Sequence, residues 1–141
     1  MTLLHAGCVC VGGKGVLFLG ESGSGKSDLA LRMIDAGAQL VADDQVELKA
    51  ENGALIASAP EKIRFLLEAR GVGILQLPHQ ANATVALAVS LVVRANVERL
   101  PEPAFFSCEG VRVPLLSLHA FDASTPAKIR LFLSAACLPL P

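Results

Sequence analysis

The sequence predicts an α/β fold, a P-loop domain built on a mixed, hairpin-rich sheet. Three observations lead to this prediction. An apolar strand at residues 15–19 runs directly into a glycine-rich loop and then a helix, several turn motifs separate short β-like segments, and only two segments have a helical pattern. Many hairpins and few helices argue against an all-parallel sheet, because each parallel pair needs a long crossover. The 141 residues suffice for one hydrophobic core, so we expect a single domain over residues 1–141.

Strands are expected where a short apolar run is bounded by turn residues. Turns at Gly12-Gly13, Asn52-Gly53 and Glu109-Gly110 predict three hairpins, because glycine accepts the positive φ angles of tight β-turns. In chain order, the expected strands are residues 4–11, 15–19, 40–42, 46–49, 55–58, 63–67, 73–77, 85–93, 105–108 and 111–116.

Two helices are expected. The first spans residues 25–36 and ends at Gly37, since glycine closes helices readily in the left-handed conformation. The second begins at Ser124, ahead of Pro126, and runs to about Cys137. Proline suits the first turn of a helix because its missing N–H would have no partner there.

The most specific motif is the segment Gly20-Glu21-Ser22-Gly23-Ser24-Gly25-Lys26-Ser27, which fits the pattern G-x-x-x-x-G-K-[ST] at every position. Its backbone N–H groups are expected to form an anion-binding nest, strengthened by the positive end of the helix dipole. Lys26 is expected to reach the β- and γ-phosphates and Ser27 to ligate Mg²⁺. The motif therefore predicts binding of a nucleoside triphosphate. The alternative is a glycine-rich turn with a chance lysine.

The second motif is Asp43-Asp44, at the exposed end of the apolar strand 40–42. Only fifteen residues separate Ser27 from Asp43, which leaves room for one helix and a turn. One carboxylate can orient Mg²⁺ through water, and the other can accept a proton from an attacking hydroxyl. Such close acids also titrate as a coupled pair. The alternative is a solvated acidic turn.

The third candidate is Glu68 with Arg70, just before the segment 71–73. A glutamate can complete a Mg²⁺ coordination shell, and an arginine can stabilise developing phosphoryl charge. From composition alone, a surface ion pair is the favoured explanation of the two residues.

Composition excludes several classes of protein. The formal net charge of -1 gives no electrostatic basis for binding nucleic acid, and without Trp or Tyr, and with scattered Phe, no base-stacking platform is visible. Residues 83–93 are too short to span a membrane, and no signal peptide is apparent. An apolar share of 52% exceeds what a small domain can bury, which suggests a homo-oligomer.

The four cysteines show no metal-ligand spacing. Cys8 and Cys10 are two apart on an expected strand and would share one face. We expect all four, including Cys108 and Cys137, to be buried, reduced and inert rather than redox-active or metal-binding. Reduced thiols and nucleotide use both favour a cytoplasmic location.

Taken in order, the glycine loop, the segment Leu40-Val41-Ala42-Asp43-Asp44-Gln45-Val46-Glu47 and the segment Glu68-Ala69-Arg70-Gly71-Val72-Gly73-Ile74 resemble the catalytic domain of the HPr kinase/phosphorylase family. The resemblance spans about residues 1–100. It implies ATP- and Mg²⁺-dependent phosphorylation of a serine on an HPr-like phosphocarrier protein of a bacterial phosphotransferase system, with a reverse phosphorylase activity. It also implies a fold like the nucleotide-binding core of phosphoenolpyruvate carboxykinase, and a hexamer.

The same resemblance suggests a role for individual residues. Asp44 matches the catalytic aspartate, a base for the kinase and an acid for the reverse reaction. Asp43 would lie beside it as a Walker-B-like acid, and Glu68 matches a second Mg²⁺ ligand. Lys26 and Ser27 keep the roles given above.

Two further matches are His5, in Leu4-His5-Ala6-Gly7, with an active-site histidine, and Arg99, in Glu98-Arg99-Leu100, with a catalytic arginine that contacts phosphate. From its own neighbours, His5 is simply an edge-strand residue.

The chain departs from the family pattern in two ways. It is expected to be a short form consisting of the C-terminal catalytic domain. After Pro114 it also lacks the family's Pro-x-Arg-Pro-Gly-Arg-Asn segment, which is linked to phosphorylase action. Because inorganic phosphate needs cationic donors, the sequence favours the kinase direction.

Two other functions remain open. A small-metabolite kinase can place an aspartate after the same strand, and a non-enzymatic ATP sensor would need Lys26 but not Asp44. A GTPase is disfavoured because the chain has no Asn-Lys-x-Asp motif.

Overall fold

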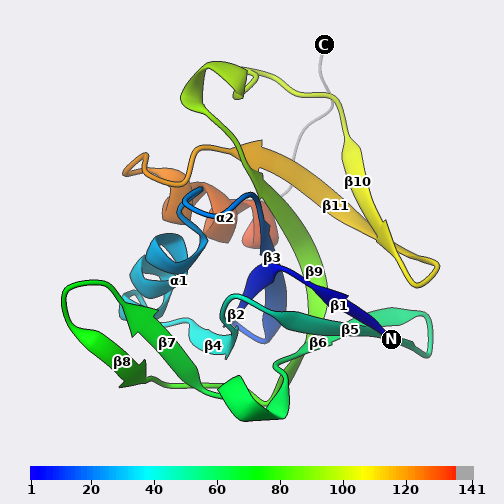
Figure 1. Ribbon diagram of the computed structural model, residues 1–141. Helices are drawn as coiled ribbons and strands as arrows, with labels where there is room; N and C mark the ends of the chain where they lie inside the picture. Colours follow the sequence, from blue (N-terminus) through cyan, green and yellow to red (C-terminus); the bar gives the residue numbers. More distant parts are fainter. Residues whose placement is uncertain (136–141) are drawn as a thin grey trace.

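The computed structural model describes residues 1–135, which form a nine-stranded mixed sheet, a separate two-stranded hairpin and two α-helices (Figure 1). Short 3₁₀ turns occupy Glu61–Ile63 and Arg94–Asn96. The helices are α1, Lys26–Asp35, and α2, Thr125–Ser134. The strands are β1 Thr2–Leu4, β2 Ala6–Val11, β3 Lys14–Leu19, β4 Gln39–Ala42, β5 Val46–Glu51, β6 Ala54–Ser58, β7 Leu66–Ala69, β8 Gly73–Gln76, β9 Asn82–Leu91, β10 Ala104–Cys108 and β11 Val111–Leu118.

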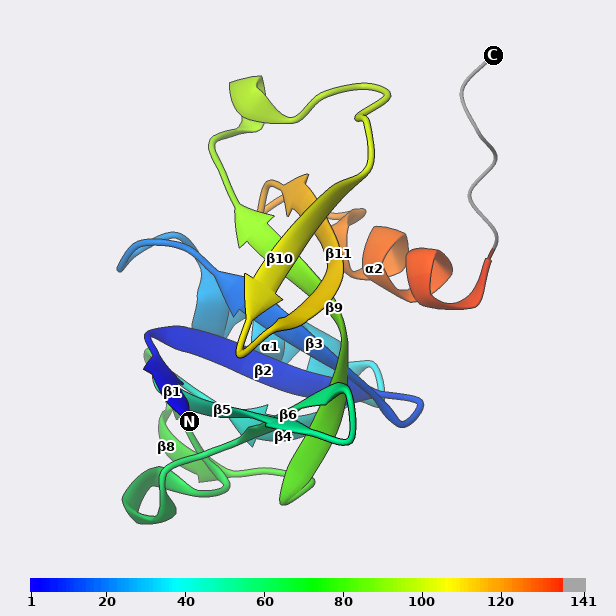
Figure 2. The same ribbon diagram turned by 90° about the vertical axis from the view of Figure 1, so that its right-hand side faces the viewer.

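The long strand β9 organises the sheet. The strand order is β1-β5-β6-β9-β3-β2-β4, and β11 joins β9 while pairing with β10. β9 runs parallel to β3 and β11, whereas the other pairs in the sheet are antiparallel. It pairs with β6 at its beginning, through Thr84, and with β11 at its end, through Leu91. Figure 2 shows β9 running from the hairpin β5–β6 to β11, so that the mixed sheet curls.

The central strands are buried on both faces. In β3, Val16 and Phe18 pack with α1 residues such as Met33, while Leu17 between them packs with Leu48 of β5 on the opposite face. This alternation follows from the two-residue period of a strand. Both helices lie on one side of the central strands (Figure 1). The continuous apolar run of the predicted strand is therefore explained by burial on two sides.

The three predicted hairpins are confirmed. Asn52 and Gly53 have φ angles of 53° and 79°, the left-handed values that a tight two-residue turn between β5 and β6 requires. Paired positive φ angles also occur in the turns of the other two hairpins, β2–β3 and β10–β11.

The predicted end of the first helix is also confirmed. Gly37 has a φ of 111° and its N–H donates to the Ile34 carbonyl at 3.0 Å, while the Ala38 N–H donates to the Met33 carbonyl at 3.0 Å. These crossed hydrogen bonds satisfy the last carbonyls of α1. The chain can then turn directly into β4, which carries the two aspartates at its end.

Two of the expected strands differ in their course from the sequence prediction, whereas the ends of the others shift by at most three residues. The expected strand 4–11 is interrupted at His5, because β1 pairs with β5 whereas β2 pairs with β3 and β4. The expected strand 63–67 is replaced by a 3₁₀ turn and by β7, which begins only at Leu66. Phe65 before it has a φ of 67°, which breaks any continuous strand. Glu68 consequently lies within a strand.

The prediction that the cysteines are buried free thiols is confirmed in part. Cys8 and Cys10 are buried free thiols on one face of β2. Burial, with the neighbouring Cys10, raises the pKa of Cys8 well above its usual range despite an opposing hydrogen bond with the Val16 backbone, so this thiol is a poor nucleophile. Cys108 is a free thiol but only half-buried. Cys137, together with the predicted end of the second helix there, lies outside the described residues; α2 ends at Ser134.

Among residues 1–135, no helix is long and apolar enough to cross a membrane.

Candidate active site

The glycine loop, residues 20–25, connects β3 to α1. Gly23 and Gly25 have φ angles of 84° and 101°, in the left-handed region that favours glycine. The Ser24 N–H donates to the Glu21 carbonyl at 3.0 Å, which folds the loop back on itself. Gly25 directly precedes the first residue of α1, so the free N–H groups of the first helical turn open toward the loop.

Gly25 also has no room for a side chain. A Cβ atom there would lie 2.6 Å from Cβ of Ala120 and 2.8 Å from Cζ of Phe121. We therefore expect Gly25→Ala to lower the free energy of unfolding by about 2–4 kcal/mol, since overpacking adds to left-handed strain. Urea denaturation measures the loss. Gly23→Ala is the control, because a Cβ atom at Gly23 meets nothing within 4 Å and only the strain remains. Equal losses in the two variants would contradict the close packing at Gly25.

Lys26 is held beneath the glycine loop. Its side chain is buried, and its Nζ donates hydrogen bonds to the carbonyls of Gly20 at 2.6 Å and Glu21 at 3.0 Å. Burial lowers the pKa of Lys26, while the charges of Asp44 and Asp43 act in the opposite direction. A buried ammonium with only carbonyl partners is well prepared to bind a more negative group, such as a phosphate.

Asp43 and Ser27 meet across the site. The Ser27 hydroxyl, on the first turn of α1, donates to Asp43 Oδ1 at 2.7 Å. Burial raises the pKa of Asp43, and the charges of Asp44 and Glu68 add to this effect, whereas hydrogen bonds from Ser27 and the Glu68 backbone oppose it. The two oxygens thus form a polar pair at the N-terminus of α1.

Neutralising Asp43 should stabilise the unliganded protein. Because the folded state raises the Asp43 pKa, ionisation of this carboxyl at neutral pH costs folding free energy. We expect Asp43→Asn, which can still accept the Ser27 hydrogen bond, to raise the Tm by a few degrees at pH 7. The gain should shrink as the pH falls through the raised pKa of Asp43 and vanish below the ordinary pKa of an aspartate, where the carboxyl is protonated in both the folded and the unfolded state. A Tm below that of the wild type at pH 7, measured by calorimetry without nucleotide or metal, would contradict the burial argument.

His5 and Asp44 form a second polar pair. His5 Nε2 lies 2.8 Å from Asp44 Oδ1, an interaction that is an ion pair when the imidazole is protonated. Asp44 has a φ of 70°, and its carbonyl accepts a hydrogen bond from the Ala6 N–H at 3.2 Å. The break between β1 and β2 is what brings His5 opposite the end of β4.

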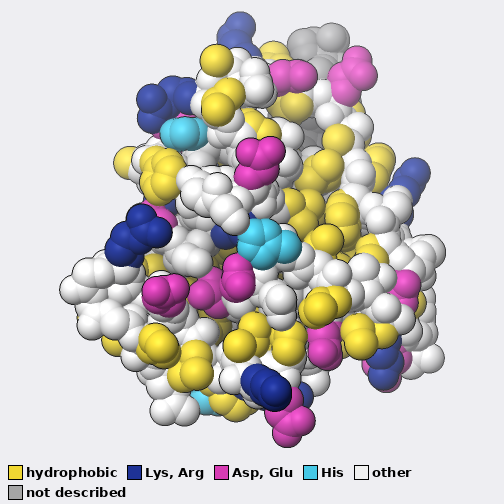
Figure 3. All heavy atoms as spheres, viewed as in Figure 1, with side chains coloured by type: hydrophobic (Ala, Val, Ile, Leu, Met, Phe, Trp, Pro, Cys, Tyr) yellow, Lys and Arg dark blue, Asp and Glu magenta, His cyan; other side chains and the backbone are white. Residues whose placement is uncertain are grey.

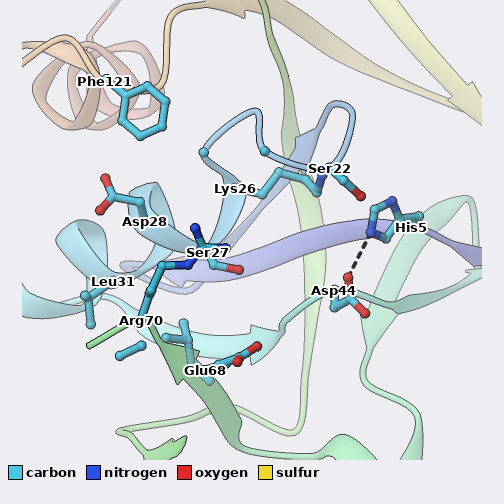
Figure 4. A pocket seen from close by; sticks show the side chains of 14 residues that line it. His5, Ser22, Lys26, Ser27, Asp28, Leu31, Asp44, Glu68, Arg70 and Phe121 are labelled. Atoms are coloured by element: carbon cyan, nitrogen blue, oxygen red, sulfur yellow. Dashed lines mark hydrogen bonds and ion pairs between the residues drawn. The ribbon is translucent and has the colours of Figure 1, made fainter. Parts of the chain in front are cut away.

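These groups surround a cavity of about 440 Å³, here called the loop cavity. In Figure 4, His5 and Asp44 lie at one end, Phe121 lies at the other, and Lys26 and Ser27 lie between them. The cavity is lined by His5, Ser22, Gly23, Gly25, Lys26, Ser27, Asp28, Leu31, Asp44, Leu67, Glu68, Ala69, Arg70 and Phe121.

The structure brings most of the predicted site residues together. Glu68 and Arg70 line the loop cavity from β7 and the turn that follows it, although both are exposed. Asp43 does not itself line the cavity, but it accepts a hydrogen bond from Ser27, which does. Arg99 is not brought there: it is exposed between the 3₁₀ turn Arg94–Asn96 and β10, and it does not line the cavity.

Five cavity residues were missed by the sequence analysis: Asp28, Leu31, Leu67, Ala69 and Phe121. Leu67 and Ala69 flank Glu68 on β7. Asp28 and Leu31 follow the glycine loop on α1, so helical spacing was a signal that could have found them. Phe121 comes from the segment between β11 and α2, which has no recognisable motif.

A family model described as the HPr Serine kinase C-terminal domain matches residues 1–104. The chain belongs to this family. Every site residue predicted from the sequence lies within the matched part of this HPr serine kinase domain, whereas Phe121 lies after it.

Individual relatives agree with this assignment. A protein of Oceanobacillus iheyensis named HPr kinase/phosphorylase 1 is 47% identical over 134 residues, covering 90% of this chain and 43% of the relative. The HPr kinase/phosphorylase of a Geobacillus species is 51% identical over 77 residues, or 54% of this chain and 25% of the relative. The chain therefore spans less than half the length of these two curated relatives.

A solved structure resembles the whole fold. The Hpr(Ser) kinase/phosphatase from Coxiella burnetii superposes with a TM-score of 0.83 at 30% identity, covering 94% of each chain. The mixed α/β fold with its curled sheet is thus the fold of an HPr kinase structure. The predicted fold class is confirmed at this level.

Proposed function

We propose that this chain is an ATP-dependent protein-serine kinase that phosphorylates an HPr-like phosphocarrier protein of a bacterial phosphotransferase system. The observation that carries the proposal is the loop cavity, where the glycine loop and Lys26 face the His5–Asp44 pair. The names of the relatives, HPr kinase/phosphorylase, support the choice of acceptor.

ATP is the proposed phosphoryl donor. The backbone N–H groups of the glycine loop and of the first turn of α1 would bind its phosphates, with the helix dipole adding to the attraction. Lys26 would exchange its carbonyl partners, Gly20 and Glu21, for the β- and γ-phosphates. A strand, a glycine loop and a helix in this order also support the proposed likeness to the nucleotide-binding core of phosphoenolpyruvate carboxykinase.

The residues present fit a magnesium ion. Ser27 and Asp43 supply two oxygens within 2.7 Å of each other, and Glu68 lines the same cavity. Within residues 1–135 no three His, Cys, Asp or Glu side chains form a complete metal cage. This suits Mg²⁺, which takes one or two protein carboxylates and completes its shell with water and phosphate oxygens. Its contribution when bound would be to neutralise charge on the transferring phosphoryl group.

Asp44 is the proposed catalytic base. As the acceptor serine oxygen bonds to the γ-phosphorus, its proton would pass to the Asp44 carboxylate. The bond from the γ-phosphorus to the β–γ bridging oxygen breaks, and ADP leaves with that oxygen. His5, 2.8 Å from Asp44 Oδ1, would hold the carboxylate in place and stabilise its charge. In the reverse direction, the protonated Asp44 would act as the acid.

The reverse phosphorylase reaction is proposed as the weaker activity. Inorganic phosphate needs cationic donors, and the segment after Pro114, in β11, continues with apolar residues rather than arginines. Arg70, which lines the loop cavity, is the guanidinium available for this role.

We also propose that the chain forms homo-oligomers, as a hexamer if it follows its family, and works in the cytoplasm, where ATP is available. Hydrophobic side chains gather over β10 and β11 in Figure 3. Phe105 of β10 is 47% exposed, although the Arg112 guanidinium lies 4.0 Å from its ring centre. Exposed apolar patches of this kind often mark interfaces.

The direct test incubates the purified chain with ATP, Mg²⁺ and the HPr-like protein of the same bacterium, and reads the acceptor by intact mass. The expected result is a gain of one phosphoryl group, located on a serine by fragmentation. ATP consumption with a labelled small molecule, but no labelled protein, would favour a metabolite kinase. Tight ATP binding with no transfer in any fraction of a lysate would favour an ATP sensor.

A further inference from the structure

The two ends of the loop cavity carry different chemical groups. At one end, Asp44 and His5 supply the groups that suit a reacting terminal phosphate, and in the middle lie Lys26 and the start of α1. A triphosphate laid along this line must send its nucleoside toward the opposite end. Figure 4 shows that this end is bounded by Phe121.

Phe121 is held in place but leaves much of its ring uncovered. Its side chain is 54% exposed, and its ring meets the His119 imidazole edge-to-face at a centroid distance of 5.8 Å. More than half of its surface is therefore free to contact a ligand.

The backbone on both sides of Phe121 is tied down. The Ala120 carbonyl accepts a hydrogen bond from Arg32 of α1, and Arg32 is itself held by Asp28 at 2.9 Å. On the other side, Arg94 donates two hydrogen bonds to Asp122 Oδ1, at 2.8 and 2.6 Å. The ring therefore sits on an anchored segment, so little conformational entropy is lost when a ligand stacks on it.

Phe121 also touches the phosphate-binding machinery. A Cβ atom on Gly25 would lie 2.8 Å from Phe121 Cζ, which places the ring against the backbone at the start of α1. Leu31 of α1 also lines the cavity. An aromatic face and an aliphatic side chain at the exit from an anion nest suit a flat heterocycle attached to a phosphate chain.

We infer that Phe121 is the platform on which the nucleobase of the bound nucleotide stacks. The inference rests on the proposed ATP-dependent function and assigns to this site a residue that lies beyond the matched family segment. Stacking on one aromatic side chain contributes about 1–3 kcal/mol per base, which corresponds to about 5- to 150-fold in affinity.

The test compares ATP with inorganic triphosphate, which has the same phosphate chain but no base, as ligands in titration calorimetry. Phe121→Ala should weaken ATP by about 5- to 150-fold and leave triphosphate within about twofold of the wild type. Phe121→Tyr, which keeps the aromatic face, should restore ATP affinity. Leu131→Ala is the control, because Leu131 is 62% exposed on α2 and does not line the loop cavity.

Two outcomes would overturn the inference. Equal weakening of ATP and triphosphate would mean that Phe121 only supports the glycine loop, and unchanged ATP affinity would mean that the base lies elsewhere. Failure of the proposed function would give a different result. If Phe121→Ala selectively weakened ATP binding but the wild-type chain transferred no phosphoryl group to any protein, the kinase assignment would fail and this inference would stand.

Discussion

Asp44→Asn is expected to lower kcat for phosphoryl transfer by about 10²–10⁴-fold, the usual contribution of a positioned general base. The amide has nearly the shape of the carboxylate and can still accept a hydrogen bond from His5, whose Nε2 lies 2.8 Å from Asp44 Oδ1 in the wild type. It cannot take the proton of the acceptor serine. Because Asp44 lies at the far end of the loop cavity from Phe121 and is not part of the glycine loop, the Kd for ATP should stay near that of the wild type.

The measurement pairs single-turnover kinetics with calorimetry on the same protein sample. Glu51→Gln removes an exposed carboxylate at the end of β5, outside the loop cavity, and should change neither kcat nor Kd. Wild-type turnover in Asp44→Asn would show that another group accepts the proton. A large loss of ATP affinity would show that Asp44 acts in binding instead.

Lys26→Met is expected to weaken ATP binding by at least about 30-fold, since losing one partner of a buried, charge-assisted interaction costs about 2–5 kcal/mol. Methionine keeps most of the length and the apolar stem of the side chain but removes the ammonium that, among the described residues 1–135, lines the loop cavity. Lys49→Met, on an exposed part of β5, makes the same change of charge elsewhere and should leave the Kd unchanged. An unchanged ATP affinity in Lys26→Met, measured by titration calorimetry, would contradict the phosphate-binding assignment of the glycine loop.

The sequence predicted the local features of the fold well. The turns at Asn52-Gly53 and Glu109-Gly110 need positive φ angles. Few residue types adopt such angles, so these hairpins could be recognised from the local sequence alone. Gly37 marked the end of α1 for the same reason. The glycine loop was recognisable because a strand and a helix must flank it in a fixed order.

Features that depend on distant partners were not predictable in the same way. Residues 4–11 have a uniform strand pattern, and the break at His5 exists because β1 pairs with β5 while β2 pairs with β3 and β4. That break is what turns His5 toward Asp44. The start of β7 depends on its pairing with β8 and on the positive φ of Phe65, neither of which a single-strand pattern reveals.

The same distinction between local motifs and distant contacts applies to the residues of the candidate site. Lys26, Ser27 and Asp44 belong to compact motifs with a chemical signature, and they line one cavity, with Asp43 hydrogen-bonded to Ser27. Phe121 has no such signature, because an isolated phenylalanine in a sequence is most often a core residue. Tertiary contacts bring it to the cavity, such as the hydrogen bond from Arg32 to the Ala120 carbonyl, 88 residues further along the chain.

The most direct measurement is a crystal structure of the chain with Mg²⁺ and an ATP analogue that cannot be hydrolysed. It should show the triphosphate cradled by residues 20–27, Lys26 turned from the Gly20 and Glu21 carbonyls to the phosphates, and the γ-phosphorus next to the Asp44 carboxylate. A nucleotide whose γ-phosphate lies far from Asp43 and Asp44, with both carboxylates pointing away from it, would contradict the account.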